Sequence, residues 1–197
     1  MKRNLLITIL ILMLPISIFA SPFGLEMGMT LEEITEACNG EEPHKIQDEI
    51  YLIKPEKSHP LFEEYAVYVN DKTGLYQIRA FSSSIESNKY GEEIKNAFSN
   101  LKDRIKKTYG IPEIIDTVDR NISSFYQTDE YWFKTLKEGS RKLYAIWGEK
   151  QSLKDNLVTI TLECTADRGF LDGYGHITLY YYFSNNSSVE DEQDFVF

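Results

Sequence analysis

Cysteine, histidine and basic residues are scarce in this chain. Its 197 residues include two Cys and three His, and 21 Lys and Arg stand against 31 Asp and Glu. The sequence contains no Gly-x-Ser-x-Gly elbow, no His-Glu-x-x-His motif and no glycine-rich phosphate loop. Its histidines lack metal-ligand spacing, and neither cysteine has a neighbouring histidine that would activate a catalytic thiol. These absences favour a non-enzymatic protein that holds no metal and no other cofactor.

A basic surface is also missing. The formal net charge is −10, and the densest basic cluster, Lys102, Arg104, Lys106 and Lys107, is interrupted by Asp103. Binding a polyanion requires a continuous basic face. We therefore exclude nucleic acid as a partner and interpret the cluster as the solvated side of a helix.

The first twenty residues are typical of a secretory signal peptide. Lys2 and Arg3 precede an apolar run over residues 5–19, and the small residue Ala20 stands before Ser21. The run is too short and wrongly flanked for a membrane anchor. We predict cleavage between Ala20 and Ser21, which removes two positive charges from the formal −10 and leaves −12. The expected product is periplasmic or secreted, with no stable membrane anchor after processing.

The two cysteines, Cys38 and Cys164, lie far apart in the sequence. An oxidising compartment would allow them to form a disulfide. In the chain-entropy model, a loop of this length would add up to about 4–5 kcal/mol to stability. Two buried free thiols are the alternative, and the sequence leaves both possibilities open.

Hydrophobic periodicity predicts a long helix within residues 88–112. Apolar residues recur at steps of three and four, which places them on one stripe of a helix. The stripe consists of Ile94, Phe98, Leu101, Ile105 and Tyr109. Gly110 can adopt the left-handed conformation that ends a helix, and Pro112 prevents the helix from continuing. We interpret the stripe as a surface that packs on the core.

Two shorter helices are predicted from their first residues. Thr30 precedes an apolar run and Glu33 follows three residues later, which is the pattern of a capping box. A second short helix is expected to begin at Thr128, which could cap it, and to end at Gly139. Both helices precede segments with the alternation of β-strands.

Strands are predicted over residues 49–54, 64–70, 75–81, 141–147, 157–164 and 174–183, with a further short strand at 114–118. His44 and His59 are expected in surface loops. The order of elements predicts an α+β domain over residues 21–184, in which an antiparallel sheet is built from two helix-plus-three-strand-meander halves, 24–86 and 87–184. The helices should pack on one face of the sheet. Residues 185–197 form an acidic tail.

The alternation of the last two strands predicts which side chains face the helices. Val158, Ile160, Leu162 and Cys164 should share the core face, with Leu157 on the other. In the last strand, Ile177, Leu179, Tyr181 and Phe183 alternate with more polar residues. Those residues, which we predict as binding candidates beside Thr159 and Thr161, are Tyr174, His176, Thr178, Tyr180 and Tyr182. Exposed tyrosines mark recognition surfaces, although Tyr and Thr also favour strands for packing reasons alone.

Several stretches resemble known exported proteins. Residues 23–34 contain Gly28-Met29-Thr30-Leu31-Glu32-Glu33 and are similar to the opening of the β-lactamase-inhibitor-protein and outer-membrane-assembly-lipoprotein folds. Residues 74–78, 88–93, 109–112 and 132–147 resemble an uncharacterised family of Gram-negative periplasmic proteins. The resemblance implies a fold and a compartment but no functional residue. The lipid-bearing cysteine of the assembly lipoprotein is missing here.

Taken together, these patterns favour a binding protein. We expect an exported protein that interacts with a protein or envelope component through the Tyr and Thr face of its sheet. The alternative is an envelope hydrolase or a small-ligand carrier whose site is assembled between the two halves.

Overall fold

The computed structural model of the chain describes residues 21–167 and 173–186. The predicted signal peptide and all but the first two residues of the acidic tail lie outside this part. The fold is α+β, with an antiparallel nine-stranded sheet and its helices on one side, as predicted. None of the described helices is long and apolar enough to cross a membrane.

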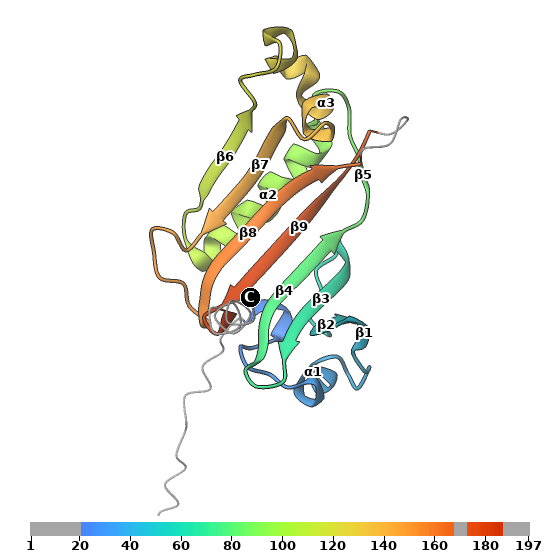
Figure 1. Cartoon of the computed structure of the whole chain (residues 1–197), viewed down its shortest axis with the longest axis vertical. Coiled ribbons are helices and arrows are strands. Elements are labelled where there is room, and N and C mark those ends of the chain that lie inside the picture. Colours follow the sequence, from blue (N-terminus) through green and yellow to red (C-terminus); the bar gives the residue numbers. More distant parts are fainter. Residues whose placement is uncertain (1–20, 168–172, 187–197) are drawn as a thin grey trace, which may run out of the picture.

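The sheet joins two meanders along one central seam (Figure 1). The first half supplies β1 (His44–Gln47), β2 (Ile50–Ile53), β3 (Phe62–Asn70) and β4 (Gly74–Ser82). The second half supplies β6 (Glu113–Val118), β7 (Arg141–Trp147), β8 (Leu157–Ala166) and β9 (Tyr174–Phe183). Their order is β1-β2-β3-β4-β9-β8-β7-β6, and the short β5 (Ile85–Glu86) also pairs with β9. The halves therefore meet where β4 pairs with β9.

Helix α2 (Glu92–Tyr109) covers one side of the second half. All five residues of its predicted stripe are buried in the core, which confirms the prediction from periodicity. In Figure 1, β7, β8 and β9 lie in front of this helix. The view therefore looks onto the opposite side of the sheet, which we call the outer face. Gly91 precedes α2 with φ of 71°, and any side chain there would collide with Trp132.

The capping box predicted for the first helix is present. Helix α1 (Leu31–Ala37) begins after Thr30, whose Oγ1 accepts the N–H of Glu33 at 3.3 Å. The Glu33 carboxylate in turn accepts the N–H of Thr30 at 2.8 Å. The helix buries Ile34 and is preceded by a single 3-10 turn, η1 (Pro22–Gly24). Local hydrogen bonding thus determines where this helix starts.

The region between β6 and β7 differs from the prediction in one detail. It contains the 3-10 turns η2 (Ser124–Gln127) and η3 (Asp129–Tyr131), followed by α3 (Trp132–Lys137). Thr128 does not cap the helix, because its hydroxyl donates to the carbonyl of Phe125 at 3.1 Å. The helix itself is present where it was expected, and Trp132 is buried.

Two predictions about strands are wrong. His44 lies at the start of β1 rather than in a loop, although its side chain is exposed. In β8 the alternation breaks at a register shift between Leu157 and Thr159. Leu157 pairs with Phe183 and is buried, whereas Val158 is 47% exposed. A bulge adds one residue to a strand, so the side chains on one side of it point to the face opposite to the one that simple alternation predicts.

The two cysteines are free thiols, and both are buried. Cys38 ends α1, whereas Cys164 lies on β8. Burial raises the pKa of both thiols. The structure therefore corresponds to the second of the two alternatives that the sequence left open.

Candidate functional site

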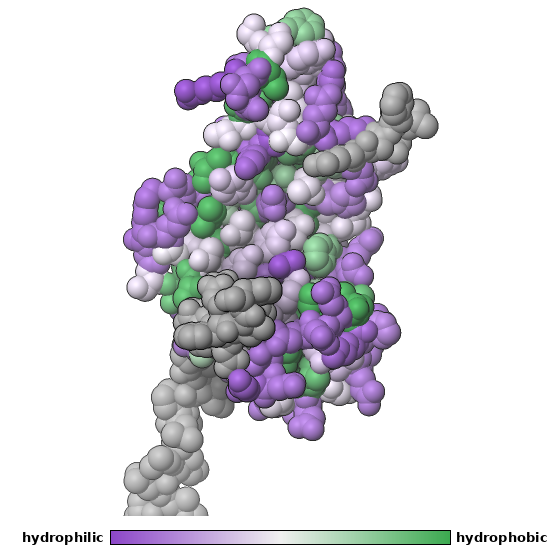
Figure 2. Space-filling model, in the orientation of Figure 1, coloured by the Kyte–Doolittle hydropathy of each residue, from purple (hydrophilic) through white to green (hydrophobic). Residues whose placement is uncertain are grey.

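The predicted binding residues of β9 lie on the outer face, on alternate positions from the buried core residues. Tyr174 is exposed, His176, Tyr180 and Tyr182 are half-buried, and Thr178 is buried. The predicted Tyr and Thr face is therefore partly enclosed by its neighbours on β4 and β8. Figure 2 shows weakly polar side chains along the middle of this face, with strongly hydrophilic ones at its rim and around α1.

Strand pairing brings residues of the first half beside these tyrosines. Arg79 pairs with Tyr180 across the seam, and Tyr182 pairs with Gln77, which in turn pairs with Tyr68. The Arg79 Cζ lies 4.5 Å from the ring centre of Tyr68 and 5.4 Å from that of Tyr180. The rings of Tyr180 and Tyr182 are stacked, with centres 6.2 Å apart and planes at 9°. We call Tyr68, Arg79, Tyr180 and Tyr182 the Tyr–Arg row.

Hydrogen bonds hold Arg79 and Tyr180 in place. A guanidinium only donates, so the oxygen of the Gln77 amide faces it and accepts from Arg79 Nε at 2.8 Å and Nη2 at 3.2 Å. The Tyr180 hydroxyl donates to Glu163 Oε2 at 3.3 Å. Burial, and secondly the charge of Glu163, raise the pKa of Tyr180 to about 12. Tyr180 is therefore a neutral donor at physiological pH, and the side chains of Arg79 and Tyr180 are oriented before any partner arrives.

Sequence reasoning missed half of this row. Tyr68 and Arg79 belong to strands about a hundred residues before β9, and no local pattern indicates that β4 pairs with β9. One signal was available in β4 itself. Arg79 is the only charged residue among its nine, so it had to face away from the core or find a partner there.

One histidine of the outer face lies beside a carboxylate. His176 Nε2 lies 3.1 Å from Asp167 Oδ1 on the exposed end of the strand. Thr165 pairs with His176 on β8. Among the residues that the structure describes, no group of three or more His, Cys, Asp or Glu is arranged to hold a metal ion.

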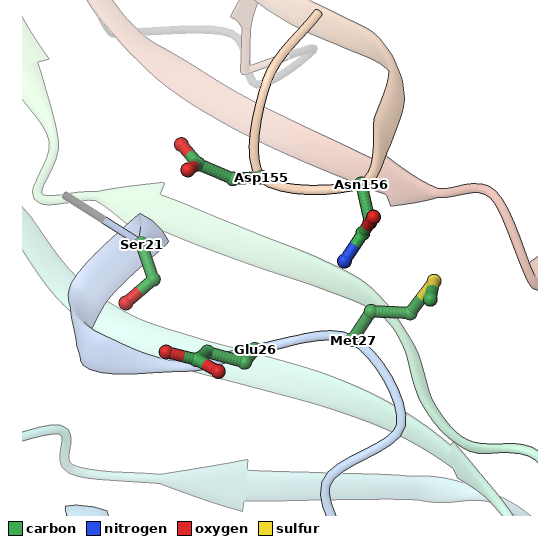
Figure 3. A pocket seen from close by; sticks show the side chains of 5 residues that line it. All are labelled: Ser21, Glu26, Met27, Asp155 and Asn156. Carbon is green, nitrogen blue, oxygen red and sulfur yellow. The ribbon is translucent and has the colours of Figure 1, made fainter. Parts of the chain in front are cut away.

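A separate hollow of about 210 Å³ lies where the first described residues meet the turn before β8. Figure 3 shows Asp155 and Asn156 on that turn, opposite Ser21, Glu26 and Met27 of the segment that leads to α1. Ser21, the predicted first residue after cleavage, thus borders a hollow that carries two carboxylates.

Asp155 also connects this hollow to the core. Its Oδ2 accepts the hydroxyl of Tyr109 at 2.9 Å, whereas its buried Oδ1 has no hydrogen-bond partner in the described structure. Burial is the main cause that raises the pKa of Tyr109, and the nearby Tyr181 and the bond to Asp155 add to it. The contact fixes the last turn of α2 against the turn before β8.

Comparisons with models of protein families, with curated proteins and with solved structures find no match to this chain.

Proposed function

We propose that the protein is an exported, non-enzymatic binding protein whose partner is another protein, docked on the Tyr–Arg row. The observation that carries this proposal is the position of Arg79 between the rings of Tyr68 and Tyr180. Tyrosine and arginine dominate the residues that contribute most to protein interfaces. The row presents both types in a fixed arrangement on the face opposite the helices.

The charge of Arg79 suggests what the partner presents. The guanidinium forms no ion pair with any described residue, and its hydrogen bonds go to the neutral amide of Gln77. A carboxylate of the partner could therefore bind its remaining N–H groups, since charge-assisted bonds to arginine are strong and directional. The neighbouring rings offer flat contact area at low cost in side-chain entropy. The partner chemistry that fits is an Asp or Glu flanked by apolar or aromatic side chains.

Cross-linking in the cell, followed by mass spectrometry, would identify the partner. Binding of the purified pair would then be measured for Arg79→Gln and Tyr180→Ser, with Tyr90→Ser as a control. Tyr90 is exposed to a similar degree as Tyr174 but lies beside α2, away from the row. We expect each row variant to weaken binding by about tenfold or more, because buried Arg and Tyr anchors typically contribute at least this much.

The control should bind as the wild-type protein does. Wild-type affinity in both row variants would refute the docking site, whereas equal losses in all three variants would show a general effect on the fold. Loss in Tyr180→Ser with none in Arg79→Gln would refute the carboxylate part of the proposal.

A further inference from the structure

A second pocket lies on the helix-covered side of the sheet, between the two halves. It measures about 210 Å³ and opens between η1, the loop before β3 and the last turns of α2. Its inner wall is apolar and aromatic, formed by Phe23, Phe62, Leu101, Ile105, Leu179 and Tyr181. The Phe23 ring meets those of Phe62 and Tyr181 edge to face, at 6.1 and 5.9 Å. We call this the α2 pocket.

Two polar side chains of opposite halves meet at its mouth. His59 belongs to the loop before β3, and its Nε2 lies 3.2 Å from Nη1 of Arg104 on α2. On the other side of the ring, the N–H of Leu61 donates to Nδ1 at 3.2 Å. Burial, and secondly the charge of Arg104, lower the pKa of His59, so the ring is neutral at physiological pH.

These contacts leave a hydrogen-bonding conflict. A neutral imidazole has one donor nitrogen and one acceptor nitrogen. Since Nδ1 accepts from Leu61, the proton sits on Nε2, where it faces a guanidinium that only donates. The opposite tautomer would move the conflict to Leu61 instead of removing it. With the proton on Nε2, two donors face each other at the mouth of the pocket, and an anionic oxygen there would accept from both.

The positive charge of Arg104 is not paired with any carboxylate of the described residues. Its neighbour Asp103 pairs with Lys102 at 3.5 Å, and Arg104 forms no ion pair with a described residue. The guanidinium geometry matches a carboxylate, which accepts two hydrogen bonds side by side. The volume is below the ~300–1,000 Å³ of pockets for drug-sized ligands. Charge, lining and size together specify a small ligand with one carboxylate and an apolar body.

We propose that the α2 pocket binds a small monocarboxylate, with the carboxylate between His59 and Arg104 and the apolar body against Phe23, Phe62 and Tyr181. This proposal is independent of docking on the Tyr–Arg row, because the two sites share no residue and lie on opposite sides of the sheet.

The test is calorimetric titration of the purified protein with 3-phenylpropionate and octanoate. The uncharged 3-phenylpropanol and the short acetate serve as ligand controls, because each lacks one of the two required parts. Arg104→Gln is the test variant, and Lys106→Gln is its matched control. Lys106 lies on the same helix, is exposed and does not line the pocket, and its substitution removes the same charge.

We expect saturable binding of 3-phenylpropionate or octanoate to the wild-type protein. Binding should be about tenfold to hundredfold weaker when the alcohol replaces the acid, or when the Arg104→Gln variant replaces the wild-type protein. Lys106→Gln should bind as the wild-type protein does. The proposal is overturned if neither long carboxylate binds, if the alcohol binds as tightly as the acid, or if the two variants lose affinity equally. A His59→Gln variant extends the test, and unchanged affinity there would exclude the histidine from the site.

Discussion

Tyr180 and Tyr181 are consecutive residues of one strand, yet they belong to different environments. Tyr181 lies on the covered face, 7% exposed, with its ring centre 5.9 Å from that of Phe23 and 6.4 Å from that of Tyr109. Tyr180 lies on the outer face and contacts Arg79 and Glu163. The same residue type therefore fills the core on one side and joins a polar network on the other. What a tyrosine does here is determined by residues from other strands.

The largest effect is expected at alkaline pH, where the free energy of unfolding should fall. Burial raises the pKa of Tyr76, Tyr109, Tyr180 and Tyr181 in the folded chain, whereas tyrosine in an unfolded chain ionises near pH ~10. Above that pH the unfolded state loses protons that the folded state retains, so stability falls as pH rises. Tyrosinate absorbance measures the ionisation and circular dichroism the unfolding, and both are followed together from pH 8 upward. Each unit by which folding raises a pKa corresponds to about 1.4 kcal/mol of stability.

One substitution isolates the contribution of Tyr181 in the alkaline range. Tyr181→Phe should flatten the loss of stability with rising pH, because Phe has no proton to lose. Ionisation of all tyrosines near pH ~10 while the fold persists would contradict the assignment of these side chains to buried positions.

The β8 bulge gives the next largest effect and a direct test of which face each residue occupies. Leu157→Ala should cost about 2–4 kcal/mol, since it leaves a cavity opposite Phe183. Val158→Ala should change stability by less than about 0.5 kcal/mol, because Val158 is an exposed side chain. Urea unfolding of both variants measures the difference. A larger loss of stability for Val158→Ala than for Leu157→Ala would contradict the bulge and support simple alternation.

A modest loss of stability is expected from truncation on the outer face. Tyr180→Ser removes one long hydrogen bond to Glu163 and a half-buried ring, so we expect a loss of only about 1–2 kcal/mol. The variant should therefore remain folded in the binding experiment. For Tyr181→Ser we expect a larger loss of stability, about 3–5 kcal/mol. Thermal unfolding of the two variants measures the difference. Equal losses in the two variants would mean that the outer face packs as a second core.

Features set by neighbouring residues could be predicted from the sequence. The capping box of Thr30 and Glu33, the stripe of α2 and the strand alternation in β9 all depend on spacings of two to four residues. The α+β class followed from the order of these segments. Such patterns depend on periodicity and capping, which act within one element.

Features set by distant residues could not be predicted. Periodicity does not show that β4 pairs with β9, so the neighbours of Tyr180 stayed unknown. The bulge at Val158 shifts the register without any marker residue such as glycine. The α2 pocket depends on a ring nitrogen of His59 that meets Arg104 across 45 positions of sequence. The β4–β9 pairing and the α2 pocket arise only when the two halves come together, and the bulge arises only when β8 pairs with β9.

The sheet has two margins, because β1 and β6 are the outermost strands of its described part. Each margin carries an exposed isoleucine, Ile46 at 54% and Ile114 at 52%. An unpaired strand edge is a template for a second copy of the same strand. A register shift between Lys45 and Gln47 makes β1 a poor template, whereas β6 pairs regularly with β7 along its length. At the β6 margin, the formal charge of −10 for the full sequence, or −12 after the predicted cleavage, opposes pairing between copies, and 0.1 M salt screens this repulsion beyond about 10 Å.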